Sequence, residues 1–597
     1  DDVAMDLSGL ILEKTEGIPF FIEEFVRALK DMEIIVRNDT YHFVKDTDNV
    51  AVPCTIQDVI MARVDSLPDP PKEVLQAGSA IEREFSYKLI KAVTELPEHE
   101  VLSYLSVLIY SELIYERGIF PESTYIFKHA ITRQVVYDSI LTNKKKLLHQ
   151  KIGKAIEDVY RDNLDGYYSI LADHFIFSDN FEKTAEYSRL ASDRARSQGA
   201  LATAISYGQK RIAALERQRP TLEVQLQLID ARTSQGLTLF MTGKLTEAKE
   251  AVEPIVEMTL KSDDKRRLGQ IYFILGSYQH SVEENSTQGL ELLQKAIQHA
   301  EETNDVRTTA MAYFYYGETL CLNCQFEKGA ASIVKAIRIM EAAQNLWAAS
   351  AMYSHLSYYG HNYQGNVEEG LATSLKALEI AQHSGDIHSR AHAYVCNGIS
   401  CFYKGFFAAA EEHLLKGIEL YEHHPVPAIG HQALGYTYFE TGDYKKARTH
   451  HEKAIWYREQ AGVLTSCVKL NKMALARAVQ ADGGKDPDIP SLVQLLRDTK
   501  FKLYYGTMAR HLAEILFHLG EAHFAEAESW LQAAILNHEG GGMKWDLASD
   551  CMVFVQFLKL QGRLEEEKDY LTRALLLFSE CGAQGWCRKI ETDSAQG

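Results

Sequence analysis

Two cysteines and several adjacent pairs of histidine or glutamate are the residues of this sequence whose types could do chemistry. Cys321 and Cys324 form its only CxxC motif, and a zinc site would need a second pair or histidines at a matching spacing. We therefore interpret them as two buried or half-buried thiols. The adjacent pairs are Glu23–Glu24, Glu411–Glu412, His423–His424 and His450–His451. Neighbours in a helix point to different sides, which favours surface positions over metal ligands or acid–base pairs.

Nucleotide hydrolysis by this chain alone is not expected. No Gly-x-x-x-x-Gly-Lys-Ser/Thr segment occurs in the sequence, and this loop is what cradles the phosphates in P-loop ATPases. We also find no ordered Ser/His/Asp or Cys/His set. The prediction is that the chain itself is not an enzyme and carries no cofactor of its own.

Composition limits the partners and the compartment. The chain has 597 residues, with 63 Lys plus Arg against 82 Asp plus Glu, and the resulting formal charge of −19 disfavours nucleic acid and anionic lipid. An odd number of scattered cysteines, nine in all, suits a reducing compartment, so we expect a cytoplasmic protein. No 18-residue apolar run and no leader are present, which predicts neither a membrane span nor a signal peptide. The opening segment DDVAMDLSGL lacks an initial Met, and we expect it to continue from a longer protein.

Most of the chain consists of a repeat with a period of about 40 residues. In the segment from Gly430 to Gly462, small or medium residues stand at Gly435, Tyr438, Ala447 and Ala454, with steps of 3, 9 and 7. The same steps recur in five other segments, which begin at Gly236, Ser277, Gly317, Gly398 and Val555. With positions 358 and 515 added, the first positions lie about 40 residues apart, with one gap of 80. Small residues let one helix approach the next, and each repeat buries its face only against its neighbours. The loop GGKDPDIP, residues 483–490, separates the two helices of a degenerate copy.

These steps resemble those of the tetratricopeptide family, although its usual period is 34 residues. The resemblance covers roughly residues 180–590 and implies an α-solenoid superhelix that binds proteins or peptides. Aromatic helices such as AMAYFYYGETL (310–320) and AMYSHLSYYGHNY (351–363) could line a concave peptide groove. Aromatic residues at helical spacing are more often part of a core, and we favour that interpretation.

The front of the chain has a different pattern. The segment GIPFFIEEFVRALK, residues 17–30, is a Gly-x-Pro turn that leads into an amphipathic helix, and proline is favoured in the first turn. A helix entered through Pro53, with Thr55 as its N-cap, follows. Residues 113–129 then have the pattern of a β-hairpin. Helices that end in a hairpin indicate a winged-helix domain, and His129 stands at the start of the next helix, where a phosphate would also fit.

A winged helix raises the question of DNA binding. Lys144, Lys145 and Lys146, with Lys151 and Lys154, are basic. The two candidate recognition segments, residues 84–100 and 97–110, are mixed or acidic, and they offer no set of Arg and Lys for groove contacts. We interpret the lysine run as a solvated helix face and expect no nucleic-acid partner.

In their order, the segments GIPFFIEEFVRAL, VPCTIQDVIMARVDSL, AIEREFSYKLI, STYIFKHAITRQVVYDSIL and KKKLLHQKIGKAIED resemble the lid, winged-helix and linker regions of bacterial STAND ATPases, the AAA-type signal-transduction ATPases. The match spans about residues 8–200. Relatives of this kind are commonly fused to class III adenylate/guanylate cyclases. The resemblance implies that Gly17 and Pro19 lie beside the adenine of ATP or ADP in the intact parent, that His129 contacts the ADP phosphate, and that Phe20, Phe21, Phe25 and Leu29 pack the lid helix. Ala130 stands where several relatives have Asp.

The complete prediction is a mainly α protein, in which a winged-helix domain with a small β-hairpin precedes a tetratricopeptide-type α-solenoid superhelix. Its expected parts are an incomplete ATPase lid (1–50), the winged helix (51–140), a helical linker (141–200) and the repeats (201–590). The implied function is that of a sensor region, which binds a protein or peptide, or contacts the ATPase domain of its own chain, and so controls an output domain, most plausibly a nucleotide cyclase. A freestanding adaptor and a winged-helix transcription regulator are the alternatives.

Overall fold

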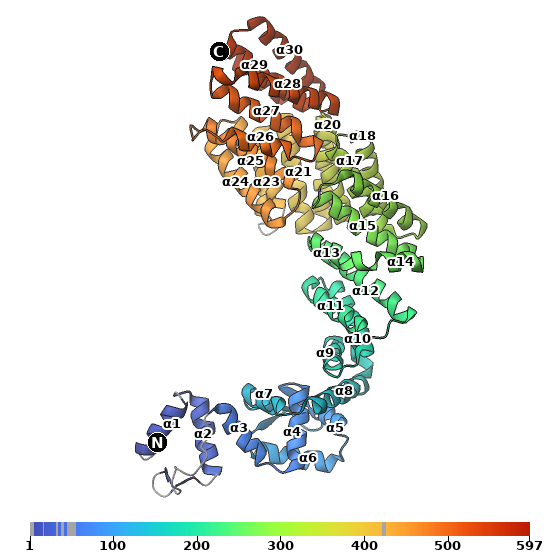
Figure 1. Ribbon diagram of the computed structural model, residues 1–597, viewed down its shortest axis with the longest axis vertical. Helices are drawn as coiled ribbons and strands as arrows, with labels where there is room; N and C mark the ends of the chain where they lie inside the picture. The colour runs from blue at the N-terminus through green and yellow to red at the C-terminus, as the bar shows by residue number, and fades with distance from the viewer. Residues whose placement is uncertain are drawn as a thin grey trace. The chain divides into compact units, whose positions relative to one another are not determined.

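The computed structural model describes residues 5–15, 17–31, 34–37, 41–43, 55–420 and 426–596. It is mainly helical and divides into two compact units, Asp1–Ala231 and Arg232–Gly597 (Figure 1). The division falls within α12 (Leu222–Met241). Cys54, the Phe20 side chain and the pair His423–His424 lie outside the described residues.

The first unit combines short helices with two small sheets. β1 pairs antiparallel with β2, and a three-stranded antiparallel sheet has the order β3–β5–β4. Its elements are α1 (Met5–Thr15), α2 (Pro19–Asp31), β1 (Ile35–Arg37), β2 (Tyr41–Phe43), α3 (Ile56–Asp65), α4 (Asp69–Ile81), β3 (Glu84–Ser86), α5 (Tyr87–Thr94), α6 (Glu98–Tyr110), β4 (Ile114–Arg117), β5 (Thr124–Phe127), α7 (Ala130–Asp138), α8 (Thr142–Val159), η2 (Arg161–Tyr167), α9 (Tyr168–Phe177), α10 (Phe181–Ser197) and α11 (Leu201–Glu216).

Local sequence explains how α3 begins. Thr55 is its N-cap, as predicted: the Thr55 hydroxyl accepts a hydrogen bond from the amide of Asp58 at 3.2 Å, and the Asp58 carboxylate accepts one from the amide of Thr55 at 3.1 Å. This reciprocal capping box satisfies two amides that the first helical turn would otherwise leave unpaired. It fixes the start of the helix that carries Arg63 toward α2.

Ion pairs hold α2 against the helices and strands that follow it. Glu24 is 1% exposed and pairs with Arg63 of α3, which is also buried. Glu23 accepts a hydrogen bond from Lys128, and Arg27 pairs with Glu112 at 2.6 Å. The prediction that Glu23 and Glu24 both lie on exposed faces is therefore wrong for Glu24, because adjacent helical residues face different sides and one of the two faces meets α3.

The second unit is a succession of helical hairpins, in which each helix from α15 on packs on the one that follows it. Its elements after α12 are α13 (Leu245–Val252), η3 (Glu253–Ile255), α14 (Val256–Ser262), α15 (Lys265–Ser281), α16 (Ser286–Glu302), α17 (Val306–Leu322), α18 (Phe326–Ala342), α19 (Leu346–His355), η4 (Leu356–Asn362), α20 (Val367–Ser384), α21 (Ile387–Lys404), α22 (Phe407–Glu419), α23 (Val426–Glu440), α24 (Tyr444–Ala461), α25 (Thr465–Ala481), α26 (Ile489–Arg497), α27 (Lys502–His518), η5 (Glu521–His523), α28 (Phe524–Gly541), α29 (Lys544–Gln561), α30 (Leu564–Glu580) and α31 (Gln584–Gln596).

The small residues of the repeat lie where two helices approach most closely. A Cβ atom added at Gly317 of α17 would come within 2.7 Å of the backbone oxygen of Gly329 in α18, and one added at Gly398 of α21 would come within 3.0 Å of the Ala410 oxygen in α22. Helix axes this close require glycine at the crossing. The spacing of small residues in the sequence thus marks the contact points of the hairpins.

Segments far apart in the chain also meet within the second unit. The amide of Leu464 donates to the Ser281 carbonyl at 2.7 Å, and Glu284 accepts hydrogen bonds from the amide and hydroxyl of Ser466, each at 2.7 Å. These residues are about 180 positions apart in the sequence. Helices of early repeats therefore pack against those of late repeats, and the interior of the superhelix is lined from several turns at once.

Candidate functional site

The interior of the second unit holds a cavity of about 840 Å³. Its walls come from the segment after η4 and from α21, α23, α25, α27, α29, α30 and α31. Aromatic side chains supply much of the wall: Tyr363, Phe402, Tyr403, Tyr436, Phe439, Phe517, Trp545, Phe578 and Trp586. A concave, mostly apolar space with a few convergent polar groups is the usual form of a ligand site.

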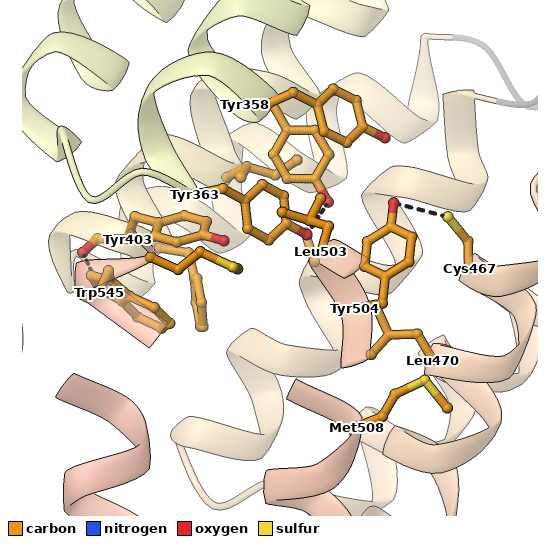
Figure 2. Close-up of a cluster of buried hydrophobic side chains, with 14 of the residues drawn as sticks. Tyr358, Tyr363, Tyr403, Cys467, Leu470, Leu503, Tyr504, Met508 and Trp545 are labelled. Atoms are coloured by element: carbon orange, nitrogen blue, oxygen red, sulfur yellow. Dashed lines mark hydrogen bonds between the residues drawn. The ribbon is translucent and has the colours of Figure 1, made fainter. Parts of the chain in front are cut away.

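Hydrogen bonds between distant segments fix the aromatic wall. Trp545 of α29 donates from Nε1 to the Tyr403 carbonyl at 3.0 Å, and Trp586 of α31 donates to the Phe402 carbonyl at 2.9 Å. Gly405, which ends α21 with a φ of +81°, permits this approach, because an added Cβ would lie 2.4 Å from the Trp586 amide. Figure 2 shows Trp545 against Tyr403, with Tyr363 beside them.

A paired set of charges lies on one side of the cavity. Arg510 of α27 donates to Asp550 at 2.9 Å and to Asp546 at 3.2 Å, and all three are buried. The Arg477 guanidinium lies 3.6 Å above the Phe439 ring and pairs with Glu514 at 2.7 Å. The two carboxylates raise the pKa of Arg510 further above its usual value, although its burial alone would lower it. Arg510 therefore stays charged in its buried position beside the cavity.

Other polar atoms at the cavity have no partner among the described residues. His511 is 2% exposed, and neither of its ring nitrogens makes a hydrogen bond within that part of the chain. The same is true of the Tyr436 hydroxyl and of one carboxylate oxygen of Asp546. Burial, followed by the charges of Arg477 and Arg510, holds the pKa of His511 well below its usual value. The neutral ring offers one donor and one acceptor to a ligand.

A cluster of buried tyrosines continues from the cavity into the core (Figure 2). The hydroxyls of Tyr358 and Tyr363 are 3.1 Å apart, and the Cys467 thiol donates to the Tyr504 hydroxyl at 3.2 Å. Tyr358 belongs to η4, a π-helical turn, which is a feature found frequently at functional sites. Burial raises the pKa of each of these tyrosines, so the hydroxyls are neutral hydrogen-bonding groups rather than acids at neutral pH.

The residues predicted to contact a nucleotide lie in the first unit. Gly17, with a φ of +73°, is exposed and ends the turn before α2, and Pro19 is the exposed first residue of that helix. His129 is the N-cap residue of α7 and is half-buried. Burial, and then the charge of Lys128, lowers the pKa of His129, while Glu23 acts in the opposite direction. The contact of Lys128 with Glu23, one turn after Pro19, brings this part of the chain to α2. A role in nucleotide binding stays a prediction.

The lysine run is paired rather than free. Lys144 lies 3.2 Å from Glu73, Lys146 lies 2.5 Å from Asp179, and Lys151 lies 2.9 Å from Glu95. Lys145 lies over the Tyr137 ring at 4.4 Å. These contacts agree with a solvated helix face.

The structure also places the cysteines, histidines and tyrosines that the sequence analysis considered as possible ligands or groove residues. Cys321 is buried and Cys324 half-buried, which confirms their interpretation as thiols, and no group of metal ligands occurs in the described ranges. His450 and His451 were predicted to be surface residues, which is wrong for His451: it is 1% exposed and bonds Asn471 at 3.0 Å. Tyr358 is buried, as a core interpretation of that segment predicts, whereas Tyr363 also lines the cavity. None of the described helices is long and apolar enough to cross a membrane.

Comparisons with known proteins bear on the repeats. Residues 389–460 match the tetratricopeptide repeat family model. A STAND protein with a tetratricopeptide repeat sensor, PH0952 from Pyrococcus horikoshii, is a structural neighbour at 14% identity and a TM-score of 0.35, covering 95% of this chain and 75% of its own. A Rap protein in complex with Competence and Sporulation Factor is another, at 14% identity and a TM-score of 0.42, covering 64% of this chain and 99% of its own. A search of curated proteins found no match.

Sequence reasoning missed the polar groups of the cavity. Arg510, Asp546 and Asp550 belong to helices α27 and α29, and His511 follows Arg510 directly. Charged residues on the predicted inner face of a repeat helix are the signal that could have found them, since most positions on that face are apolar or small. Using this signal requires knowing which side of each helix faces the interior of the superhelix.

Proposed function

We propose that this chain is the sensor region of a multidomain signalling ATPase. Its repeats bind a protein or peptide partner in the interior of the solenoid, and that binding controls an attached output domain, a nucleotide cyclase. The observation that carries the proposal is the cavity lined by buried, unpartnered polar groups, above all His511. A buried polar atom without a hydrogen bond costs free energy, and a ligand that supplies the bond recovers it.

A peptide segment suits the cavity better than a single rigid small molecule. The wall alternates aromatic faces with His511, Tyr436 and Asp546, which offer both donors and acceptors. Peptide amides and side chains supply the matching groups along an extended ligand. A partner shifts a regulatory equilibrium only by its difference in affinity for the two states, so binding inside the solenoid must favour one arrangement of the repeats.

The first unit would transmit this change. Helices α4, α5 and α6 with the sheet β3–β5–β4 support a winged-helix domain, and the ion pairs of Glu23, Glu24 and Arg27 support a lid helix that is docked on it. In this proposal Gly17, Pro19 and His129 contribute to an ATP/ADP site that is completed by a P-loop elsewhere in the parent protein.

The binding proposal is tested with synthetic random-sequence hexapeptides passed over the immobilised chain, and retained peptides are identified by mass spectrometry. We expect retention by the wild type and its loss in His511→Leu, because the imidazole is the most deeply buried of the cavity-lining groups with unbonded polar atoms. His383→Leu, on the exposed face of α20, is the matched control and retains the peptides. Equal retention by His511→Leu places binding outside the cavity, and the absence of retention by the wild type contradicts the proposal.

The switch proposal is tested by calorimetry of ADP and ATP binding to the parent protein with its P-loop. We expect His129→Ala to weaken ADP more than ATP and the wild type to bind both. Unchanged ADP affinity in His129→Ala excludes a phosphate contact by this residue.

A further inference from the structure

One arginine in the second unit is buried without a partner. Arg458 of α24 is 6% exposed, and its side chain makes no hydrogen bond and no ion pair within the described part of the chain; its Nε is among the fully covered atoms left unbonded there. It continues the buried face of α24 formed by Ala447, His451 and Ala454. The side chain thus points to the interior of the superhelix rather than to solvent.

The other buried arginines are all paired. Arg63 pairs with Glu24, Arg211 with Asp230 at 2.8 Å, and Arg510 with Asp546 and Asp550. Each of these arginines is 6–7% exposed, as Arg458 is. Among the residues that the structure describes, Arg458 is therefore the one buried arginine without a carboxylate partner, and burial of an unpaired charge is costly.

Neutral groups surround the Arg458 side chain. The groups with the largest electrostatic effect on it are Cys467, Tyr359, Tyr504 and Tyr358. Burial raises the pKa of the Cys467 thiol and of the three phenols, so none of them carries a negative charge at neutral pH. They present hydroxyl and thiol groups but no counter-ion.

Two nearby carboxylates are already engaged. Glu284 and Glu318 both act electrostatically on Cys467. Glu284 accepts hydrogen bonds from Ser466 and Thr465, which fix the start of α25. Glu318 lies 3.3 Å from a ring nitrogen of His355 and 3.6 Å from one of His280. Neither carboxylate forms an ion pair with Arg458.

We propose that Arg458 binds a carboxylate group of the ligand that occupies the solenoid interior. The planar guanidinium offers two parallel donors that match the two oxygens of a carboxylate, and the hydroxyls of Tyr359 and Tyr504 can add hydrogen bonds to the same group. The hydrogen bond between Tyr358 and Tyr363 joins this position to the cavity, because Tyr363 lines the cavity wall. This inference rests on the proposed function, and it adds the chemistry of the ligand: a peptide with a C-terminal carboxylate or an Asp or Glu side chain at one end.

The experiment passes four random-sequence hexapeptide pools over the immobilised full chain. The pools have a free or an amidated C-terminus, each with or without Asp and Glu. The variant is Arg458→Met, and its matched control is Arg448→Met, on the same helix but part-exposed and paired with Asp482. We expect the wild type and the control to retain carboxylate-bearing peptides at least tenfold above the amidated pool that lacks Asp and Glu, and Arg458→Met to lose that preference. Retention of the free-terminus pool without Asp and Glu identifies the peptide C-terminus as the bound group. Retention of the amidated pool with Asp and Glu identifies an acidic side chain.

The other outcomes are distinct. Retention that ignores carboxylates, or that is the same in Arg458→Met as in the wild type, overturns the assignment of Arg458 and leaves the proposed function standing. No retention of any pool by the wild type overturns both. Thermal unfolding without peptide shows that the variant folds, and it tests the same idea: removal of an uncompensated buried charge is expected to raise the midpoint by about 2–4 °C. A fall of that size marks Arg458 as structural and contradicts the inference.

Discussion

The two units differ in how completely their buried polar side chains are paired. In the first unit Arg63 and Glu24 neutralise each other where α2 meets α3, and the pair sets the position of the helix that carries Pro19. In the second unit Arg458 and His511 are as deeply buried but have no partner among the described residues. Paired buried groups fix the architecture in both units, as Arg510 does with Asp546 and Asp550 in the second. In our proposal the unpaired Arg458 and His511 are instead held ready for a ligand. Stability measurements can separate these two roles without knowledge of the ligand.

The largest expected effect is from Arg63→Met. It removes the direct partner of the buried Glu24 carboxylate, which keeps only the Arg27 guanidinium at 3.9 Å. Breaking a buried pair of this kind costs about 3–5 kcal/mol. The same substitution at Arg458 is expected to have the opposite sign. Calorimetric unfolding of the full chain, with hydrogen exchange to follow α2, measures the effect. Lys72→Met is the control, because Lys72 is part-exposed and its pair with Asp65 contributes less than about 1 kcal/mol. Equal losses in the two variants would contradict the special role of the buried pair.

The next effect concerns the helix crossings of the repeats. Gly317→Leu places a side chain against the backbone of Gly329 and is expected to destabilise the second unit by about 3 kcal/mol. All five tryptophans lie in this unit, so the loss of tryptophan fluorescence on denaturation reports it directly. Gly540→Ala, in an exposed position of α28 with open space around it, is expected to raise stability by up to about 1 kcal/mol. If Gly317→Leu leaves the stability of the second unit unchanged, α17 and α18 can move apart at their crossing.

These glycines also mark how far the sequence could predict the structure. The small residues that allow the crossing of α17 with α18 recur at a fixed spacing in the sequence. The turn glycines Gly405 and Gly442 have the positive φ that glycine adopts readily after the end of a helix. Such features depend on residues within one or two repeats. The N-cap Thr55 was predictable for the same reason.

The cavity could not be predicted in this way. Trp545 meets Tyr403, and Tyr363 meets the same wall, only because repeats more than 100 residues apart pack on each other in the superhelix. The surface positions predicted for the adjacent pairs were wrong for the same reason. Glu24 and His451 are buried, while their neighbours Glu23 and His450 are exposed or half-buried, and only the packing decides which of two adjacent side chains is covered. Whether Arg458 has a partner likewise depends on how η4, α25 and α27, which lie far apart in the sequence, pack around it.

A smaller effect is expected from pH in the first unit. His149 and His174 bond each other at 2.8 Å beside a cavity of about 300 Å³, and burial lowers the pKa of His149 to about 4 and that of His174 to about 3. Below about pH 6.5 the unfolded chain binds protons that the folded one does not, so stability falls as the pH drops. Between pH 7.5 and 5.5 the loss is about 1.4 kcal/mol for each histidine. Thermal unfolding at these two pH values should show a shallower decline in His174→Asn, and an unchanged decline would assign the effect to other groups.

The smallest effect is the most informative about the second unit. His451 and His511 are both buried, but only His451 has a partner, Asn471. His451→Leu strands the Asn471 side-chain carbonyl and is expected to cost about 1 kcal/mol or more, whereas His511→Leu removes two unsatisfied atoms and is expected to change stability by less than about 0.5 kcal/mol in either direction. Urea denaturation followed by tryptophan fluorescence distinguishes them. If His511→Leu lowers the free energy of unfolding as much as His451→Leu does, His511 stabilises the fold. Arg458 is then the only one of the two groups that still distinguishes the second unit from the first. If His511→Leu costs nothing and abolishes peptide retention, the imidazole serves the ligand rather than the fold.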